Sequence, residues 1–117
     1  MINKELIKEI YTTNETLTNM QINNKKVYTI TKEFSPIPSN ASSDINPNIN
    51  ELEQLYLDYN LSYYTWGGNR KYALNDSINS KLSTWISNDN KVAITSQRSD
   101  GNSWKLHAVF LYTKTTN

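Results

Sequence analysis

The chain has 117 residues, a formal net charge of +1 and no cysteine. A chain of this length can bury a core as one domain, and without thiols it has no cysteine nucleophile, disulfide or cysteine metal site. A net charge near zero creates no overall field that would attract nucleic acid or a membrane. We therefore predict a single domain over residues 1–117.

The apolar residues occur in short runs, none close to the roughly 18 residues of a membrane span. Residues 1–10 mix acidic, basic and apolar side chains, unlike the continuous apolar core of a signal peptide. These features predict a cytoplasmic protein with no membrane contact. Asn, Ile and Lys are frequent and have A/T-rich codons, so we expect the source to be a low-GC bacterium, or one of its phages or mobile elements.

The first third of the chain shows one helical pattern and one hairpin pattern. The isoleucine and leucine residues within 2–10 share one helical face, which predicts an amphipathic helix. Two segments rich in β-branched and aromatic residues then flank Asn23-Asn24, a pair that tolerates positive φ. This arrangement predicts a hairpin with strands over 16–22 and 27–34.

All three prolines lie within residues 35–47, which predicts a linker-like loop that could contact a partner. Asn46 and Pro47 then form a typical helix start, with Asn as the N-cap and Pro at the first helical position. Leu52, Leu55 and Tyr59 follow at helical spacing. We therefore predict a helix over 47–59.

A second hairpin is predicted where Gly67-Gly68-Asn69 separates the aromatic segment 62–66 from residues 70–74. Beyond it, Asn75 or Asp76 is placed to cap a helix whose apolar positions are Ile78, Leu82, Trp85 and Ile86. Residues 88–90 would end this helix.

The last part of the chain, residues 91–114, has the densest apolar content. Two apolar runs, 92–95 and 104–112, flank the polar turn residues 99–102, which predicts a third hairpin. The second run is apolar on both faces, and such a strand is usually central in its sheet. Together these elements predict an α+β fold: an antiparallel sheet of four to six strands with about three helices packed mainly on one face.

Catalytic chemistry has little support in the sequence. His107 is the only histidine, and a Ser–His–Asp reading has no local support. An RNase-like site would need His107 as general base with Glu33, Arg70, Arg98 or a tyrosine as helpers, whereas a strand histidine without a catalytic role is the simpler interpretation. Metal-ligand spacings and phosphate-binding glycine loops are missing. We expect no catalytic residue, no metal and no cofactor.

The most unusual stretch is residues 59–72, where four tyrosines and a tryptophan accompany Arg70 and Lys71. Aromatic side chains beside arginine are typical of protein interfaces, and aromatics interleaved with cations also suit single-stranded nucleic acid or a nucleotide. The same aromatics could instead be core residues. The candidate partner-binding residues are Tyr63, Trp66, Arg70, Lys71 and, from the last turn, Arg98.

Four functional hypotheses remain open at this point. The leading one is a small non-catalytic protein-binding module of the inhibitor or immunity type, which docks the aromatic and basic surface on a partner protein. The alternatives are a nucleic-acid or nucleotide-binding protein that uses the same surface, and a small RNase that depends on His107. A delivery or assembly role in a larger complex also stays open, because the apolar run 104–112 permits a cone-shaped sheet with a pocket.

Overall fold

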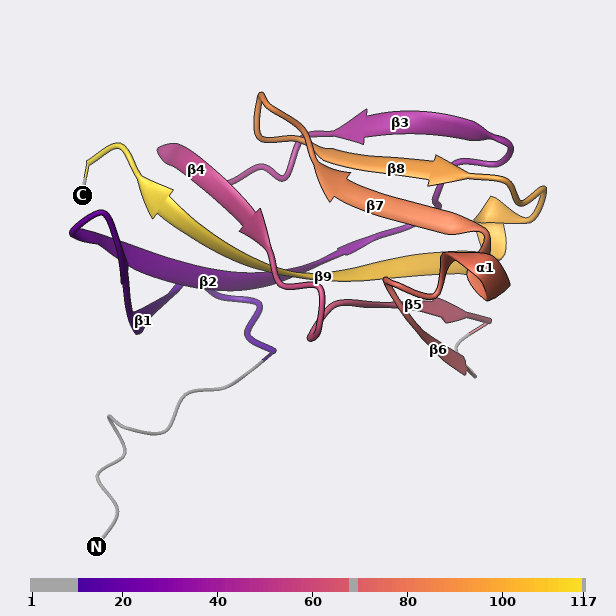
Figure 1. Ribbon diagram of the computed structural model, residues 1–117, viewed down its shortest axis with the longest axis horizontal. Helices are drawn as coiled ribbons and strands as arrows, with labels where there is room; N and C mark the ends of the chain where they lie inside the picture. The colour runs from indigo at the N-terminus through magenta and orange to yellow at the C-terminus, as the bar shows by residue number, and fades with distance from the viewer. Residues whose placement is uncertain (1–10, 68–69, 117) are drawn as a thin grey trace, which may run out of the picture.

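The computed structural model describes residues 11–67 and 70–116, and within them the chain is built almost entirely from strands. The elements are β1 (Thr16–Ile22), β2 (Lys25–Phe34), β3 (Ala41–Ile45), β4 (Leu52–Leu57), β5 (Tyr63–Trp66), β6 (Arg70–Ala73), α1 (Ser77–Ser80), β7 (Leu82–Ile86), β8 (Val92–Ser96) and β9 (Trp104–Lys114). The strands form two antiparallel sheets that lie one over the other (Figure 1). The helix predicted over 2–10 lies outside the described residues.

The long strand β9 is the centre of the larger sheet. Its described strands run in the order β1-β2-β9-β5-β6, and β4 also pairs with β9. β2 covers one edge of β9 along its length, whereas β4 and β5 pair end to end along the other edge. The turn between β4 and β5 is held to β9, because Asp58 N–H donates to the Val109 carbonyl and Val109 N–H donates to Ser62 Oγ. This confirms the prediction of a central strand over 104–112.

The core lies between the two sheets. Alternate residues of β9 from Trp104 to Tyr112 point inward and are almost completely buried. The smaller sheet, ordered β3-β8-β7, contributes Leu82, Val92 and Ile94 to the same cluster. Tyr64 reaches across to Thr84 with a hydrogen bond between their hydroxyl groups, and burial raises the pKa of Tyr64 to about 12.

Two predicted hairpins are confirmed, and the third is wrong. β1 pairs with β2 around Asn23 and Asn24, both in the left-handed region, and β5 pairs with β6. The runs 92–95 and 104–112 are strands, but β8 pairs with β3 and β7 instead of with β9. Residues 97–103 therefore cross from one sheet to the other, and the two apolar runs bury their side chains from opposite sides of the same core.

The helix predicted over 47–59 is also wrong, because β4 occupies this segment. Asn48 and Glu51 adopt left-handed φ values, 56° and 57°, which interrupt any continuous right-handed helix. Leu55 and Leu57 alternate inward with a period of two, and both are buried. The apolar spacing fits a helix and a strand equally, and pairing with β9 decides between them.

The helix predicted after residue 75 is reduced to one turn, α1. Lys81 adopts a left-handed φ of 59° directly after α1 and ends it. Leu82 and Thr84 then alternate inward as part of β7, with Trp85 on the opposite side. The residues 35–47 are likewise not one loop, since they contain β3. The predicted α+β fold with about three helices is therefore wrong, and the protein is a mostly β structure with antiparallel sheets.

Gly101 provides a test of the crossing between the sheets. A Cβ added there would lie 2.3 Å from the Ile37 carbonyl and 2.6 Å from the Pro38 carbonyl, both of them backbone atoms. We expect Gly101→Ala to lower the free energy of unfolding by about 2 kcal/mol or more, because the backbone of residues 37–38 must move. Urea unfolding measures the change.

Gly67→Ala is the matched control for this substitution. Gly67 has a positive φ of 57°, but a Cβ there would meet nothing within 4 Å. Only backbone strain of about 1 kcal/mol is expected. Equal losses at the two glycines would contradict the close contact between Gly101 and residues 37–38.

Candidate functional site

The β5–β6 hairpin carries four of the five predicted partner-binding residues, at the opposite end of the larger sheet from β1 (Figure 1). Trp66 is the register partner of Arg70, and Thr65 is the partner of Lys71. Since side chains alternate between the faces of a strand, Trp66 and Arg70 share one face, whereas Tyr63 and Lys71 lie on the other. The structure therefore does not bring the predicted residues together as one surface.

Trp66 and Arg70 lie on the face of the hairpin that continues the core, and both are exposed. The Trp66 side chain is 41% exposed, and its ring centroid lies 6.5 Å from that of the buried Trp104. Tyr72 also contacts Trp104, at 5.1 Å between ring centroids. The exposed Trp66 is thus supported from below by the buried ring of Trp104, which the half-buried Tyr72 also contacts.

Tyr63 and Lys71 belong to an aromatic stack on the outer face of the sheet. The Tyr63 and His107 rings are parallel, with centroids 4.5 Å apart, and Lys71 Nζ lies 4.6 Å from the Tyr63 centroid. β5 lies between β9 and β6, so the imidazole and the ammonium approach Tyr63 from opposite sides. Both faces of the Tyr63 ring are covered, which leaves neither face for a nucleobase.

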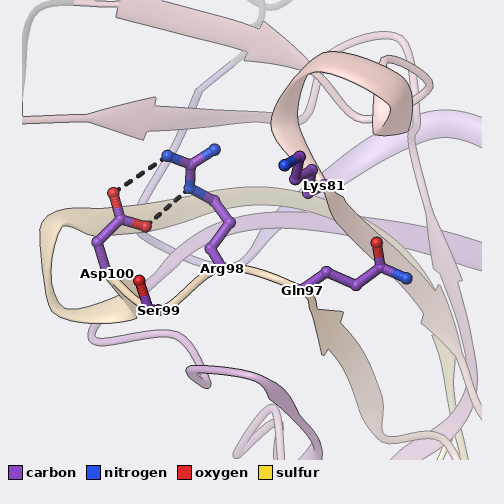
Figure 2. A pocket seen from close by; sticks show the side chains of 5 residues that line it. All are labelled: Lys81, Gln97, Arg98, Ser99 and Asp100. Carbon is purple, nitrogen blue, oxygen red and sulfur yellow. Dashed lines mark hydrogen bonds and ion pairs between the residues drawn. The ribbon is translucent and has the colours of Figure 1, made fainter.

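Arg98 is held in the crossing between the sheets, as Figure 2 shows. Its guanidinium donates to both carboxylate oxygens of Asp100, at 2.7 and 3.1 Å, and lies 4.6 Å from the centroid of the Trp104 ring. The ion pair raises the pKa of Arg98 and lowers that of Asp100. These contacts use the charge of Arg98 within the protein, so it is not a free cation beside the hairpin.

His107 lies in a polar cluster on the outer face of the larger sheet, and the sequence predicted only part of this cluster. Its Nδ1 lies 3.2 Å from Glu33 Oε1, and its Nε2 lies 3.1 Å from Thr65 Oγ1. Lys105 Nζ is 3.4 Å from the other oxygen of Glu33. Glu33 was named as a possible helper of His107, but Thr65 was missed, because only the register of β5 against β9 places it there.

This cluster limits the chemistry available to His107. The carboxylate favours the tautomer with the proton on Nδ1, so Nε2 accepts a hydrogen bond from the Thr65 hydroxyl. A general base must present a nitrogen to the substrate, and here both nitrogens already have protein partners. The stacked ring is 15% exposed at its side chain, which further restricts access.

Two further kinds of feature are absent from the described part of the chain. Within residues 11–67 and 70–116, no three His, Asp or Glu side chains converge to hold a metal ion. No helix in these ranges has the length and apolar content to span a membrane. Comparison of the chain with protein-family models, with curated proteins and with solved structures finds no match.

The pKa of His107 tests the cluster directly. Burial lowers it below the ordinary 6.5, Glu33 opposes this shift, and Lys105 and Lys71 add to it. We expect Glu33→Gln to lower the pKa further and Lys105→Met to raise it, as measured by NMR titration of the imidazole. A rise in the Glu33→Gln variant would contradict the placement of that carboxylate.

The same shift predicts how stability depends on pH. Because the folded state holds the pKa of His107 below its unfolded value, the unfolded chain binds more protons in mild acid. The contribution of His107 to the free energy of unfolding is therefore complete above pH 6.5 and is lost as the pH falls through the folded pKa. Replacement of His107 by glutamine should remove this part of the pH dependence in urea unfolding.

Arg98 and Arg70 should differ in their effect on stability. Arg98→Met removes the ion pair with Asp100 and the cation above Trp104, so we expect a loss of about 1–2 kcal/mol. Arg70→Met alters an exposed residue and should change the free energy of unfolding by less than about 0.5 kcal/mol. Urea unfolding of both variants measures the two changes in the free energy of unfolding. If Arg98→Met lost no more than Arg70→Met, the contacts of Arg98 would have no structural role.

Proposed function

We propose that this protein is a non-catalytic binding module that docks its β5–β6 hairpin on a partner protein. The observation that carries the proposal is the exposed Trp66 beside Arg70, supported from below by Trp104. An inhibitor or immunity-type protein of a low-GC bacterium, phage or mobile element is the biological setting that we propose. Its proposed location is the cytoplasm.

The composition of the hairpin supports a protein interface. Tryptophan, tyrosine and arginine are the residues that most often dominate binding energy, because they offer a large rigid area with a polar end. Contact with Trp104 restricts the motion of Trp66, so less conformational entropy is lost when a partner covers it. Within the described residues β6 pairs with β5 alone, which leaves its outer edge open to a partner.

The charge of the hairpin indicates the kind of partner. Residues 63–73 contain Arg70 and Lys71 and no acidic residue. A partner with an acidic patch would complement Arg70 on the Trp66 face, while Lys71 on the other face adds to the local positive potential, so association should be faster at low salt. We therefore propose an acidic protein surface as the target.

The alternatives have weaker structural support. Nucleic-acid binding commonly uses a series of open aromatic faces for base stacking, but Trp66 is the only well-exposed ring in the described part of the hairpin, and both faces of Tyr63 are covered by His107 and Lys71. An RNase would need a nitrogen of His107 directed at the substrate, and both nitrogens contact Glu33 and Thr65. Protein binding is the function that uses the exposed hairpin residues Trp66 and Arg70.

The double variant W66A/R70A tests the proposal. We expect wild-type protein to retain one protein from a nuclease-treated low-GC bacterial lysate, and the double variant to bind it about thirtyfold more weakly or worse. Both side chains are exposed, so the fold should be kept, as circular dichroism and urea unfolding can verify. The retained protein is identified by mass spectrometry, and its affinity is measured by calorimetry.

The matched control W85A/K91A removes one tryptophan and one cation beside the smaller sheet. This control should bind the captured protein as wild type does. Unchanged binding by W66A/R70A would refute the proposed surface. Recovery of nucleic acid, with a steep loss of affinity as salt rises, would support the nucleic-acid alternative instead.

A further inference from the structure

A cleft of about 550 Å³ lies between the edges of the two sheets, and no residue of the β5–β6 hairpin lines it. One wall is β4 and the segment after it, and the other wall is β7 and the turn that follows. Among the described residues β4 pairs only with β9, and β7 pairs only with β8. The volume lies within the range of about 300–1,000 Å³ that small-ligand sites occupy.

The cleft collects exposed aromatic rings that stack on no other ring within the described residues. The described residues contain five well-exposed aromatic side chains: Tyr11, Tyr56, Tyr59, Trp66 and Trp85. Tyr11 and Trp66 contact other rings, whereas the remaining three make no aromatic or cation–π contact within the described residues. All three of these line the same cleft: Tyr56 from the outward side of β4, Trp85 from the outward side of β7, and Tyr59 from the segment after β4. The rings therefore lie on two rims of the cleft, where an extended ligand can contact both.

Two side-chain amides of the cleft are also unused, whereas the hydroxyl of Ser87 is bonded to Asp89 and to the backbone of Lys91. Gln54 and Asn88 line it, and their side-chain amides have no hydrogen-bond partner among the described residues. Each amide can donate two hydrogen bonds and accept others. None of the residues that line the cleft is charged, so an ionic ligand would find no counter-charge there.

The edge of β4 is already occupied at one position, which argues against an added peptide strand. Asn90 accepts a hydrogen bond from Leu55 N–H at 3.2 Å and donates one to the Glu53 carbonyl at 2.9 Å. These are the backbone groups that a partner strand would use. The same pair of bonds joins the turn after β7 to β4 and so fixes one end of the cleft.

We propose that this cleft binds a neutral oligosaccharide. The flat rings of Trp85, Tyr56 and Tyr59 suit the C–H faces of pyranose rings, and the free amides suit the hydroxyl groups. A purely apolar ligand would bury the amides without partners, at a cost in free energy. The proposal uses neither Trp66 nor Arg70, so it does not depend on the proposed protein-binding function.

Amide NMR of the full chain tests the proposal with neutral oligosaccharides built from glucose, galactose, mannose, rhamnose or N-acetylglucosamine. Each is added at up to about 10 mM, which is sufficient to detect a Kd of about 1 mM. We expect at least one to shift signals of residues 54–59 and 85–88 while the signals of Trp66 and of residues 70–72 stay unchanged. The affinity should be insensitive to salt, because no charged group lines the cleft.

Variants assign the binding to these side chains. Trp85→Ala should weaken binding by about tenfold or more, and Trp66→Ala, which removes an exposed tryptophan elsewhere, should leave it unchanged. The double variant Q54A/N88A changes exposed side chains only and serves as a second test if Trp85→Ala disturbs the fold.

Three results would overturn the proposal. The first is that no oligosaccharide of the set shifts the cleft signals, and the second is that wild type and both cleft variants bind equally. The third is that an uncharged extended peptide or a second copy of the chain shifts the cleft signals while every oligosaccharide fails.

Discussion

The inner face of β9 packs against the smaller sheet, and the rest of the structure depends on this contact. Trp104, Phe110 and Tyr112 are fully or almost fully buried there, together with residues of β4, β5, β7 and β8. Because β9 pairs with β2 on one edge and with β4 and β5 on the other, it also fixes the register of its neighbours. Burial of this one strand thus supplies both the core and the alignment of the larger sheet.

The surfaces follow from the same strand. Its outward residues Lys105 and His107 meet Glu33, Thr65 and Tyr63, so a polar cluster and an aromatic stack form on the open face. Trp104 supports the exposed Trp66 on the other face, at the end of the sheet. β4, held on β9, stands opposite β7 and forms the uncharged aromatic cleft between the sheets. The core and the two candidate binding surfaces are therefore formed by different sides of the same strands.

Much of the strand content could be predicted from alternation and turn residues, as in β1, β2, β5, β6, β8 and β9. The errors occur where the apolar spacing fits both the helical and the strand period. Leu52, Leu55 and Tyr59 have the spacing of a helix, whereas Leu55 and Leu57 have that of a strand. Only the pairing of this segment with β9 decides between the two structures. The pairing of β8 with β3 and β7 likewise depends on contacts between segments far apart in the sequence.

For the candidate site, Tyr63 and Trp66 are three positions apart in one strand, so alternation alone predicts opposite faces. The contact of Glu33 with His107 needs a long-range register that no local pattern contains.

Amide hydrogen exchange of the free protein tests the central claim, that β9 holds both sheets together, most directly. The account predicts that amides of β9 from Leu106 to Tyr112 exchange slowest, only when the whole domain unfolds, while those of β1 and β3 exchange through local opening. Fast exchange across β9, or protection of residues 47–59 in a helical pattern with β9 unprotected, would contradict it.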